Sequence, residues 1–265
     1  MRIQKADKPQ ETVYKVGISI PNEAYILPEA YDNHLVHAMR CGAWEAKMKL
    51  ENELNKYNKK IKFNKVRFEY YWFTTARLLT QMARERLADN AIKQGMDYII
   101  MYDSDMILPP DFAVKMLETM RKHPKIDVLG ALAFMRNPPH YPVIYSVIEG
   151  FDRLSGGEYY IRNFVKRYPK NSLVECDAVG FGGVCIKVEL LKRMKAPYFM
   201  VTTNLGEDIW FCYKAKKEYG ARIFMDTSIK MGHLKNPEIV DEAYFENWVK
   251  QNKHDLGPEA IGVAK

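Results

Sequence analysis

The chain has 265 residues and a formal net charge of +7, because 40 Lys and Arg residues face 33 Asp and Glu residues. This length suits one large α/β domain or two small ones, and we expect one domain with an elaborated second half. The positive balance favours a phosphate-bearing ligand or an anionic surface, although it cannot choose between them.

The sequence has no run of about 18 consecutive apolar residues that could cross a bilayer, and its polar start lacks the apolar core of a secretory signal. We therefore expect a cytoplasmic protein, with peripheral association at the inner face of a membrane left open. Four widely spaced cysteines without a C-x-x-C pair argue against a zinc site or a disulfide framework. We expect these four residues to be buried free thiols: Cys41, Cys176, Cys185 and Cys212.

The first half of the chain alternates β-rich runs with segments of helical composition and spacing. The expected strand and helix pairs are 13–20 with 28–58, 66–73 with 76–94, and 98–102 with 111–122. Within the second helix, one face is expected to gather Leu79, Met82, Ala83, Leu87 and Ala91. Three such units in a row predict a parallel sheet with right-handed crossovers.

The second half has a different pattern, because a proline-rich loop at 137–142 follows the expected strand 128–134. Two β-rich pieces, 142–149 and 158–165, are separated by Ser-Gly-Gly and predict an antiparallel hairpin beside the sheet. The remaining expected elements are strands at 184–188, 222–225 and 229–231 and helices at 207–219 and 241–251. The expected fold class is α/β, with a mostly parallel central sheet flanked by helices and a smaller antiparallel element in the second half.

The segment 98–105 is an apolar strand that ends in Asp103, Ser104 and Asp105. Residues two apart in an extended chain point to the same side, so both carboxylates can face one ligand at the C-terminal edge of the sheet. Carboxylate oxygens suit Mn²⁺ or Mg²⁺, and the oxygens of a diphosphate would complete the coordination. Asp-x-Asp alone is also frequent in turns, and its place after a buried strand is what favours the metal site.

Two further acidic residues, Glu207 and Asp208, begin the expected helix 207–219. Acidic residues in a first turn commonly complement the helix dipole, and a carboxylate held ionised there can also accept a proton from a hydroxyl group. His233 follows an expected strand, where a neutral imidazole could complete a metal shell or serve a structural role. We expect the pair His34 and His37 to lie on the surface.

Read in order, Asp97 to Met106, Gly180 to Val184, Gly206-Glu207-Asp208-Ile209 and Gly232-His233-Leu234 resemble a GT-A-fold glycosyltransferase of the family 2-like kind. The resemblance covers roughly residues 13–234, and the order and spacing of the motifs carry it. It implies a GT-A, Rossmann-like fold in which 13–251 form one domain, after an extension at 1–12 and before a tail at 252–265. Residues 13–135 would bind the nucleotide, and 136–251 would bind the acceptor and carry catalysis.

The resemblance also implies roles for individual residues. Asp105 and His233 would bind the metal, with Asp103 as a further metal ligand or a ribose contact. Asp208 would be the catalytic base of an inverting reaction, and Glu207 would orient the acceptor or neighbouring groups. The remaining donor-site residues would be Ser104, Arg84, Gly182 and Gly183, although the glycines could simply form a turn.

The function implied is metal-dependent transfer of a sugar from a UDP- or GDP-sugar to an acceptor, which could be a glycan, lipid, protein or small molecule. Acceptor recognition is expected within 137–165, where tyrosines could stack on sugar rings or pack in the core: Tyr141, Tyr145, Tyr159 and Tyr160. One alternative is a sugar-phosphate nucleotidyltransferase, although residues 21–24 lack the glycine-rich basic loop expected of that class. The other is a non-catalytic module that binds nucleic acid or anionic surfaces through the basic run 56–67, which a solvated helix end and turn explain more simply.

Overall fold

The computed structural model describes residues 10–21, 28–152, 157–235 and 238–257. A seven-stranded central sheet has the strand order β2-β1-β3-β10-β5-β11-β8. Its strands are β1 (Thr12–Ile20), β2 (Val66–Thr74), β3 (Tyr98–Tyr102), β5 (Val128–Leu132), β8 (Leu173–Glu175), β10 (Gly183–Lys187) and β11 (Ile223–Lys230). The helices are α1 (Pro28–Tyr57), α2 (Thr80–Lys93), α3 (Phe112–Lys122), α4 (Val188–Arg193), α5 (Glu207–Tyr219) and α6 (Glu242–Gln251).

Most strands of this sheet run in one direction. β1 is parallel to β2 and β3, and β11 is parallel to β5. β10 lies antiparallel between β3 and β5, and β8 is antiparallel to β11 at the edge. The expected α/β class with a mostly parallel sheet and flanking helices is therefore confirmed.

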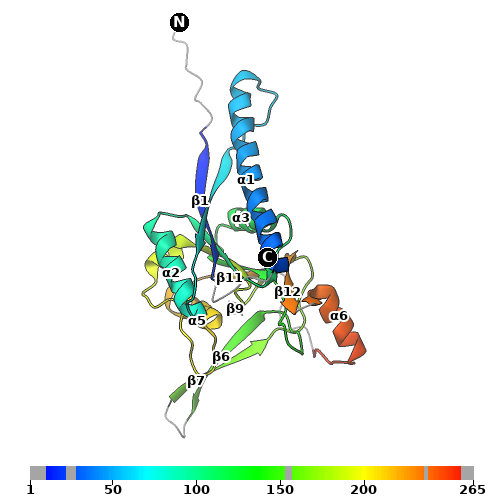
Figure 1. Cartoon of the computed structure of the whole chain (residues 1–265). Coiled ribbons are helices and arrows are strands. Elements are labelled where there is room, and N and C mark those ends of the chain that lie inside the picture. The colour runs from blue at the N-terminus through cyan, green and yellow to red at the C-terminus, as the bar shows by residue number, and fades with distance from the viewer. Residues whose placement is uncertain (1–9, 22–27, 153–156, 236–237, 258–265) are drawn as a thin grey trace.

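Two small antiparallel sheets accompany the central one. The predicted hairpin is confirmed as β6 (Ile144–Asp152) and β7 (Gly157–Phe164), with β9 (Ala178–Val179) on the other edge of β6, and it projects from the body in Figure 1. The sequence did not predict the other small sheet, in which β12 (Gly232–Lys235) pairs with β4 (Met106–Ile107) and β13 (Glu238–Val240). Its strands are too short to produce an alternating pattern.

The core lies on both faces of the central sheet. β3 is buried throughout, with Ile99 and Met101 in one apolar cluster and Ile100 and Tyr102 in the other. This alternation follows from the period of two in a strand, and a strand covered by helices on both faces has no polar side. All four cysteines are free and buried, as expected. Among the described residues, no helix is both long and apolar enough to cross a membrane.

The expected apolar face of α2 is partly wrong. The helix begins only at Thr80, so Leu79 precedes it, and both Leu79 and Met82 are exposed. The buried side consists of small or apolar residues and one arginine: Ala83, Arg84, Leu87, Ala88 and Ala91. Leu87, Ala88 and Ala91 pack in the apolar cluster that includes Ile99 and Met101 of β3, and the Arg84 guanidinium reaches Asp103 just beyond the end of that strand.

The expectation that His34 and His37 lie on the surface is wrong. Both are buried on α1, where the His34 ring packs edge-on against Tyr102 and its Nε2 lies 2.8 Å from the carbonyl oxygen of Met106. The imidazoles therefore take the place of apolar side chains between α1 and the sheet. Burial, followed by the charge of His34, lowers the pKa of His37 to about 4.

We predict that His37 makes folding stability depend on pH. In the unfolded chain His37 takes up a proton below about pH 6.5, whereas in the folded protein it stays neutral down to about pH 4. Its contribution to the free energy of unfolding is therefore complete above pH 6.5 and is lost as pH falls toward 4. Between pH 7 and 4.5 this amounts to about 2 to 3 kcal/mol. Measured by urea unfolding, the difference in the free energy of unfolding between these two pH values should be smaller for His37→Gln than for the wild-type protein. Exposed His123→Gln is the control, and equal pH dependence in both variants would contradict the assignment.

Candidate active site

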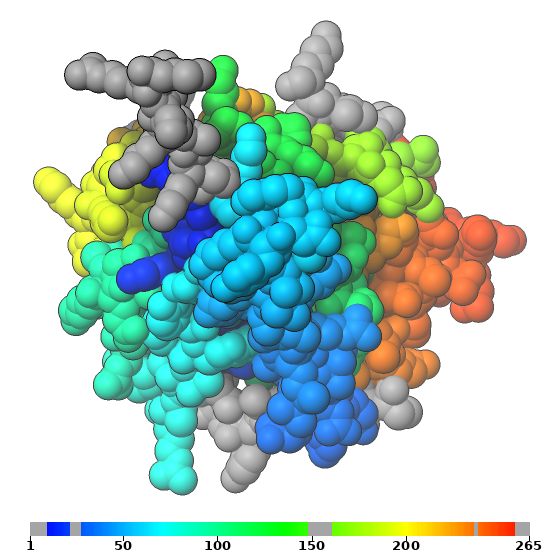
Figure 2. All heavy atoms as spheres, turned by 90° about the horizontal axis from the view of Figure 1, so that it is seen from above, coloured from blue at the N-terminus to red at the C-terminus, as the bar shows by residue number. Residues whose placement is uncertain are grey.

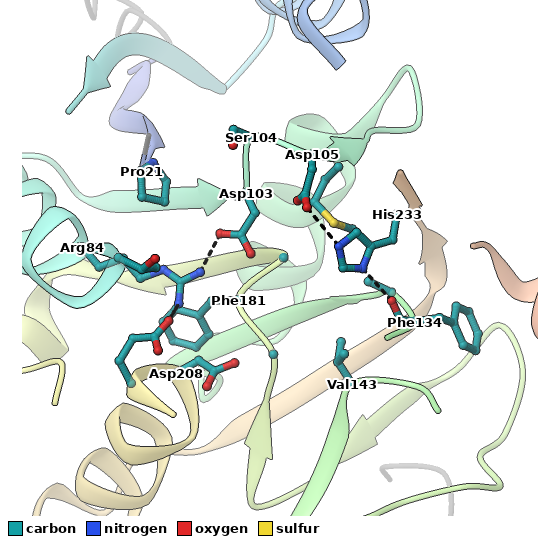
Figure 3. A pocket seen from close by; sticks show the side chains of 16 residues that line it. Pro21, Arg84, Asp103, Ser104, Asp105, Phe134, Val143, Phe181, Asp208 and His233 are labelled. Carbon is teal, nitrogen blue, oxygen red and sulfur yellow. Dashed lines mark hydrogen bonds and ion pairs between the residues drawn. The ribbon is translucent and has the colours of Figure 1, made fainter. Parts of the chain in front are cut away.

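A cavity of about 570 Å³ lies at the C-terminal ends of β1 and β3, beside the start of α5. Open α/β sheets bind ligands at this edge. All but one of the residues that the sequence assigned to the site line it: Arg84, Asp103, Ser104, Asp105, Gly182, Glu207, Asp208 and His233. The structure thus brings together motifs that are more than 100 residues apart in the chain (Figure 3).

Gly183 is the exception, since it is not among the residues that line the cavity. A Cβ atom there would come within 2.3 Å of Met231 Sδ, so this glycine permits close packing inside the sheet. Gly182 does line the cavity, and its carbonyl oxygen accepts a hydrogen bond of 3.2 Å from the Asp103 N–H. That bond fixes the backbone where β3 enters the aspartate motif.

Arg84 connects three elements around the cavity. It is only 2% exposed, and its Nη2 donates to Asp103 Oδ1 over 2.6 Å while its Nη1 donates to Glu207. Its guanidinium also lies over the Phe181 ring at 5.3 Å. Because one Asp103 oxygen and Glu207 are held by Arg84, these two carboxylates position the arginine and the strand end.

His233 lies beside Asp105 because β12 pairs with β4. The Leu234 N–H donates to the Asp105 carbonyl over 3.0 Å, and His233 Nδ1 lies 2.8 Å from the Phe134 carbonyl oxygen. Since a carbonyl can only accept, Nδ1 carries the proton and Nε2 presents its lone pair. Nε2 lies 3.2 Å from Asp105 Oδ2, and burial is the main cause that lowers the pKa of His233 and favours the neutral ring.

This pair of acceptors fits a divalent cation. Two ligands at right angles, each about 2.1 Å from Mg²⁺ or Mn²⁺, lie about 3 Å apart, which matches the separation of His233 Nε2 and Asp105 Oδ2. Within the described part of the chain, no three His, Cys, Asp or Glu side chains form a group that could hold a metal ion. A cation here would therefore take further ligands from water or from a bound phosphate.

Arg136 lies at the site, although the sequence did not predict it there. Its guanidinium forms an ion pair with Asp105, and its Nη2 lies 3.5 Å from His233 Nε2, so it places a positive charge beside two groups that face each other as acceptors. Arg136 follows β5, another strand that ends at this edge of the sheet. Its position after this strand could have indicated a place at the site, whereas the neighbouring residues form no motif that predicts one.

Asp208 approaches the same cavity from the first turn of α5, as Figure 3 shows. Its Oδ1 accepts the N–H of Ile209 over 2.7 Å. Burial is the first cause that raises its pKa to about 6, and the charges of Glu207 and Asp103 add to this against the opposing effect of Arg84. A carboxyl group that titrates near 6 can accept a proton at neutral pH and still bind it firmly enough to catalyse transfer.

Two of the tyrosines considered for acceptor binding serve the core. Tyr141 and Tyr145 are buried, and both rings contact Phe164. The Tyr141 hydroxyl also lies 2.7 Å from His254 Nε2, which ties the beginning of the tail to the domain. The side chains of Tyr159 and Tyr160 lie outside the described residues, as does most of the extension at 1–12.

No protein-family model and no curated protein matches this chain. Among solved structures, A197 from STIV is 16% identical, with a TM-score of 0.51 over 85% of this chain and 92% of that chain. Apo UDP-glucose pyrophosphorylase is 11% identical (TM-score 0.44, 90% and 98% covered), and its complex with UDP-glucose is 12% identical (TM-score 0.41, 90% and 99% covered). At 16% identity, the similarity to A197 is a similarity of fold alone.

We predict that Arg84 is required for stability. Its replacement by Met would leave Asp103 and Glu207 partly buried without their counter-charge, at a cost of about 3 kcal/mol or more. Urea unfolding at pH 7 measures the loss. Arg86→Met, on the exposed side of the same helix, should change stability by less than about 0.5 kcal/mol, and equal effects of the two variants would show that the network contributes nothing.

Proposed function

We propose that this chain is an enzyme that binds a nucleotide-diphosphate sugar through a divalent cation and transfers the sugar to an acceptor hydroxyl group. The observation that supports this most directly is one cavity that combines two functions. Asp105 and His233 present oxygen and nitrogen ligands, and Asp208 presents a separate carboxylate whose pKa is raised to about 6. A cation would neutralise the departing diphosphate as a Lewis acid.

The charges of the site explain why a cation is needed. Four carboxylates line the cavity, and the guanidiniums of Arg84 and Arg136 are paired with three of them: Asp103, Asp105 and Glu207. The paired charges largely cancel, so the cavity has little positive charge to offer a diphosphate. Binding of the donor would then depend on metal, although the whole chain is basic.

The chain's residues would act on the acceptor. Asp208 takes the proton from the acceptor hydroxyl, the hydroxyl oxygen forms a bond to the anomeric carbon, and the bond from that carbon to the diphosphate oxygen breaks with its electron pair on the diphosphate. Attack from the side opposite the leaving group inverts the anomeric configuration. Glu207 acts indirectly, since it holds Arg84, which in turn holds Asp103.

Sugar-phosphate nucleotidyl transfer is the second candidate, because the pair of Asp105 and His233 could hold the cation of either reaction. In that reaction the nucleophile is a phosphate oxygen that is already ionised near neutral pH. No general base is then needed, and the raised pKa of Asp208 would have no role in the chemistry. Asp208 is therefore the feature that favours glycosyl transfer.

We predict that Asp105→Asn weakens Mn²⁺ binding by about a hundredfold or more. Replacing a residue that only hydrogen-bonds to a metal ligand already lowers metal affinity by about 10- to 100-fold. Thermal-shift titrations with Mn²⁺ and a panel of UDP- and GDP-sugars measure this, since a ligand that binds the folded state raises its apparent stability. Asp111→Asn removes an exposed carboxylate at the start of α3 and is the control.

The products decide between the two reactions. Release of nucleoside diphosphate from the sugar donor supports glycosyl transfer. Formation of nucleoside triphosphate from the same donor and added pyrophosphate would support nucleotidyl transfer instead. If wild-type protein responds to no nucleotide sugar with Mn²⁺, both candidates are wrong.

We predict that transfer by the wild-type enzyme depends on a group that ionises near pH 6. Asp208 must be ionised to accept the proton, so kcat/KM should rise with pH through about 6 and fall about tenfold per pH unit below that. Asp208→Asn should lower kcat by about a hundredfold to ten-thousandfold while Mn²⁺ binding is kept. A variant with unchanged kcat would exclude Asp208 as the base.

A further inference from the structure

Arg136 contacts the same two atoms that would bind a cation. Asp105 Oδ2 and His233 Nε2 lie 3.2 Å apart and face each other in Figure 3. One atom of Arg136, Nη2, forms the ion pair with Asp105 Oδ2 and also lies 3.5 Å from His233 Nε2. A positively charged nitrogen therefore faces both acceptors at once, as a cation shared between them would.

Arg136 and a cation cannot use these acceptors together. A neutral imidazole has one nitrogen lone pair, so His233 Nε2 can face an N–H group or a metal ion but not both. A cation about 2.1 Å from Asp105 Oδ2 would also stand next to the guanidinium, and positive charges so close repel each other. Occupation of the site by Mn²⁺ or Mg²⁺ thus requires the guanidinium to leave.

The side chain of Arg136 is free to leave. It is 49% exposed, whereas the side chain of Arg84 is 3% exposed and holds two carboxylates. Among the described residues, Asp105 and His233 are the polar partners of the Arg136 guanidinium. An ion pair that is open to water contributes little to stability, because water can replace either partner. Arg84 is therefore the fixed positive charge of the site, and Arg136 is the movable one.

The backbone around Arg136 is held in place. The Met135 N–H donates to the Tyr141 carbonyl over 3.0 Å, which closes the segment 135–141 on itself. The buried His140 ring packs against α6, which is drawn in orange to red at one side of the molecule in Figure 1 and Figure 2. The guanidinium can therefore turn away from Asp105 about its own side-chain bonds while its backbone stays beside the cavity.

We infer that Arg136 is a displaceable counter-ion that couples cation binding to donor binding. Its guanidinium holds Asp105 and His233 in the metal-free protein, leaves them when a divalent cation binds, and then pairs with the diphosphate of the nucleotide sugar. The inference rests on the proposed function, since it assigns the order in which that site is filled.

A diphosphate suits the released guanidinium as its next partner. Diphosphate oxygens would complete the coordination of a cation held by Asp105 and His233, so they would lie beside the position that Arg136 has left. A guanidinium presents a planar set of N–H donors that matches phosphate oxygens, often two at a time. The charges balance as well, because the cation neutralises Asp105 while Arg136 neutralises part of the diphosphate.

This exchange makes two affinities depend on Arg136 in opposite directions. Arg136 competes with the cation and so lowers the affinity for metal alone, but it raises the affinity for diphosphate once metal is bound. By linkage, diphosphate raises the metal affinity by the same factor as metal raises the diphosphate affinity. A residue that merely kept Asp105 and His233 in place would change both affinities in the same direction.

The first test titrates full-length protein with Mn²⁺ alone and measures the heat of binding. We expect Arg136→Met to bind Mn²⁺ about tenfold more tightly than wild-type protein, which corresponds to acceptors that Arg136 occupies about nine-tenths of the time. Arg121→Met removes an exposed arginine at the end of α3 and should leave the affinity unchanged. Equal or weaker Mn²⁺ binding by Arg136→Met would overturn the inference.

The second test titrates UDP and GDP into protein that is saturated with Mn²⁺. Arg136→Met should bind the tighter of these two nucleotides about tenfold less strongly than wild-type protein, because charge-assisted hydrogen bonds to phosphate are lost. Unchanged or tighter nucleotide binding would exclude the pairing with diphosphate. Nucleotide binding that is equally strong without Mn²⁺ and is lost in Arg136→Met would show that Arg136 replaces the metal, and it would overturn the displacement.

Failure of this inference can be distinguished from failure of the proposed function. If wild-type protein and Arg136→Met bind Mn²⁺ equally, and both then bind UDP or GDP, only the displacement is wrong. If neither protein binds Mn²⁺, the cation site is absent and both proposals fail. Without ligands the two proteins should melt at the same temperature, because the replaced side chain is half exposed, so a difference in binding is not one of folding.

Discussion

The site depends on one buried guanidinium. Arg84 lies on α2, yet its two terminal nitrogen atoms, Nη2 and Nη1, reach Asp103 just beyond the end of β3 and Glu207 at the start of α5, and its guanidinium lies over the Phe181 ring. Acidic residues from separate elements would repel one another in a common cavity unless a fixed positive charge lay between them. Arg84 supplies that charge, so carboxylates from separate elements can lie close together in one cavity.

The division of labour among the four carboxylates follows from this constraint. Asp103 and Glu207 are paired with Arg84, whereas Asp105 lies beside His233 and is paired with Arg136. Asp208 lines the cavity from the start of α5. Two neighbouring carboxylates with different partners have different pKa values. Such a difference in pKa would allow one group to bind a cation while the other transfers a proton. In each of the two acidic motifs, 103–105 and 207–208, one residue therefore has a structural role: Asp103 in the first and Glu207 in the second.

The sequence predicted the main helices, the mostly parallel arrangement and eight of the sixteen residues that line the cavity. These follow from local periodicity and from the rule that parallel strands end at one edge of a sheet. It could not predict that β10 inserts antiparallel between β3 and β5, because an apolar strand buried on both faces looks the same in either direction. The pairing of β4 with β12, which brings His233 to Asp105, depends on contacts between residues 128 positions apart. Arg136 was missed because only its place in the assembled sheet gives it a role.

Helix α1 shows where pattern reading fails for a physical reason. Its buried side carries His34, His37 and Asn52, while its outer side carries leucines, so hydrophobicity alone assigns the two sides wrongly. Part of this polar side has defined partners, since His34 Nε2 lies 2.8 Å from the Met106 carbonyl oxygen and Asn52 donates to the Asn64 carbonyl oxygen, whereas the Nδ1 atoms of His34 and His37 have no partner within the described residues. Hydrogen bonds from a buried side chain to backbone that is distant in the sequence cannot be read from the residues of the helix itself, so a hydrophobic pattern alone cannot identify a buried side of this kind.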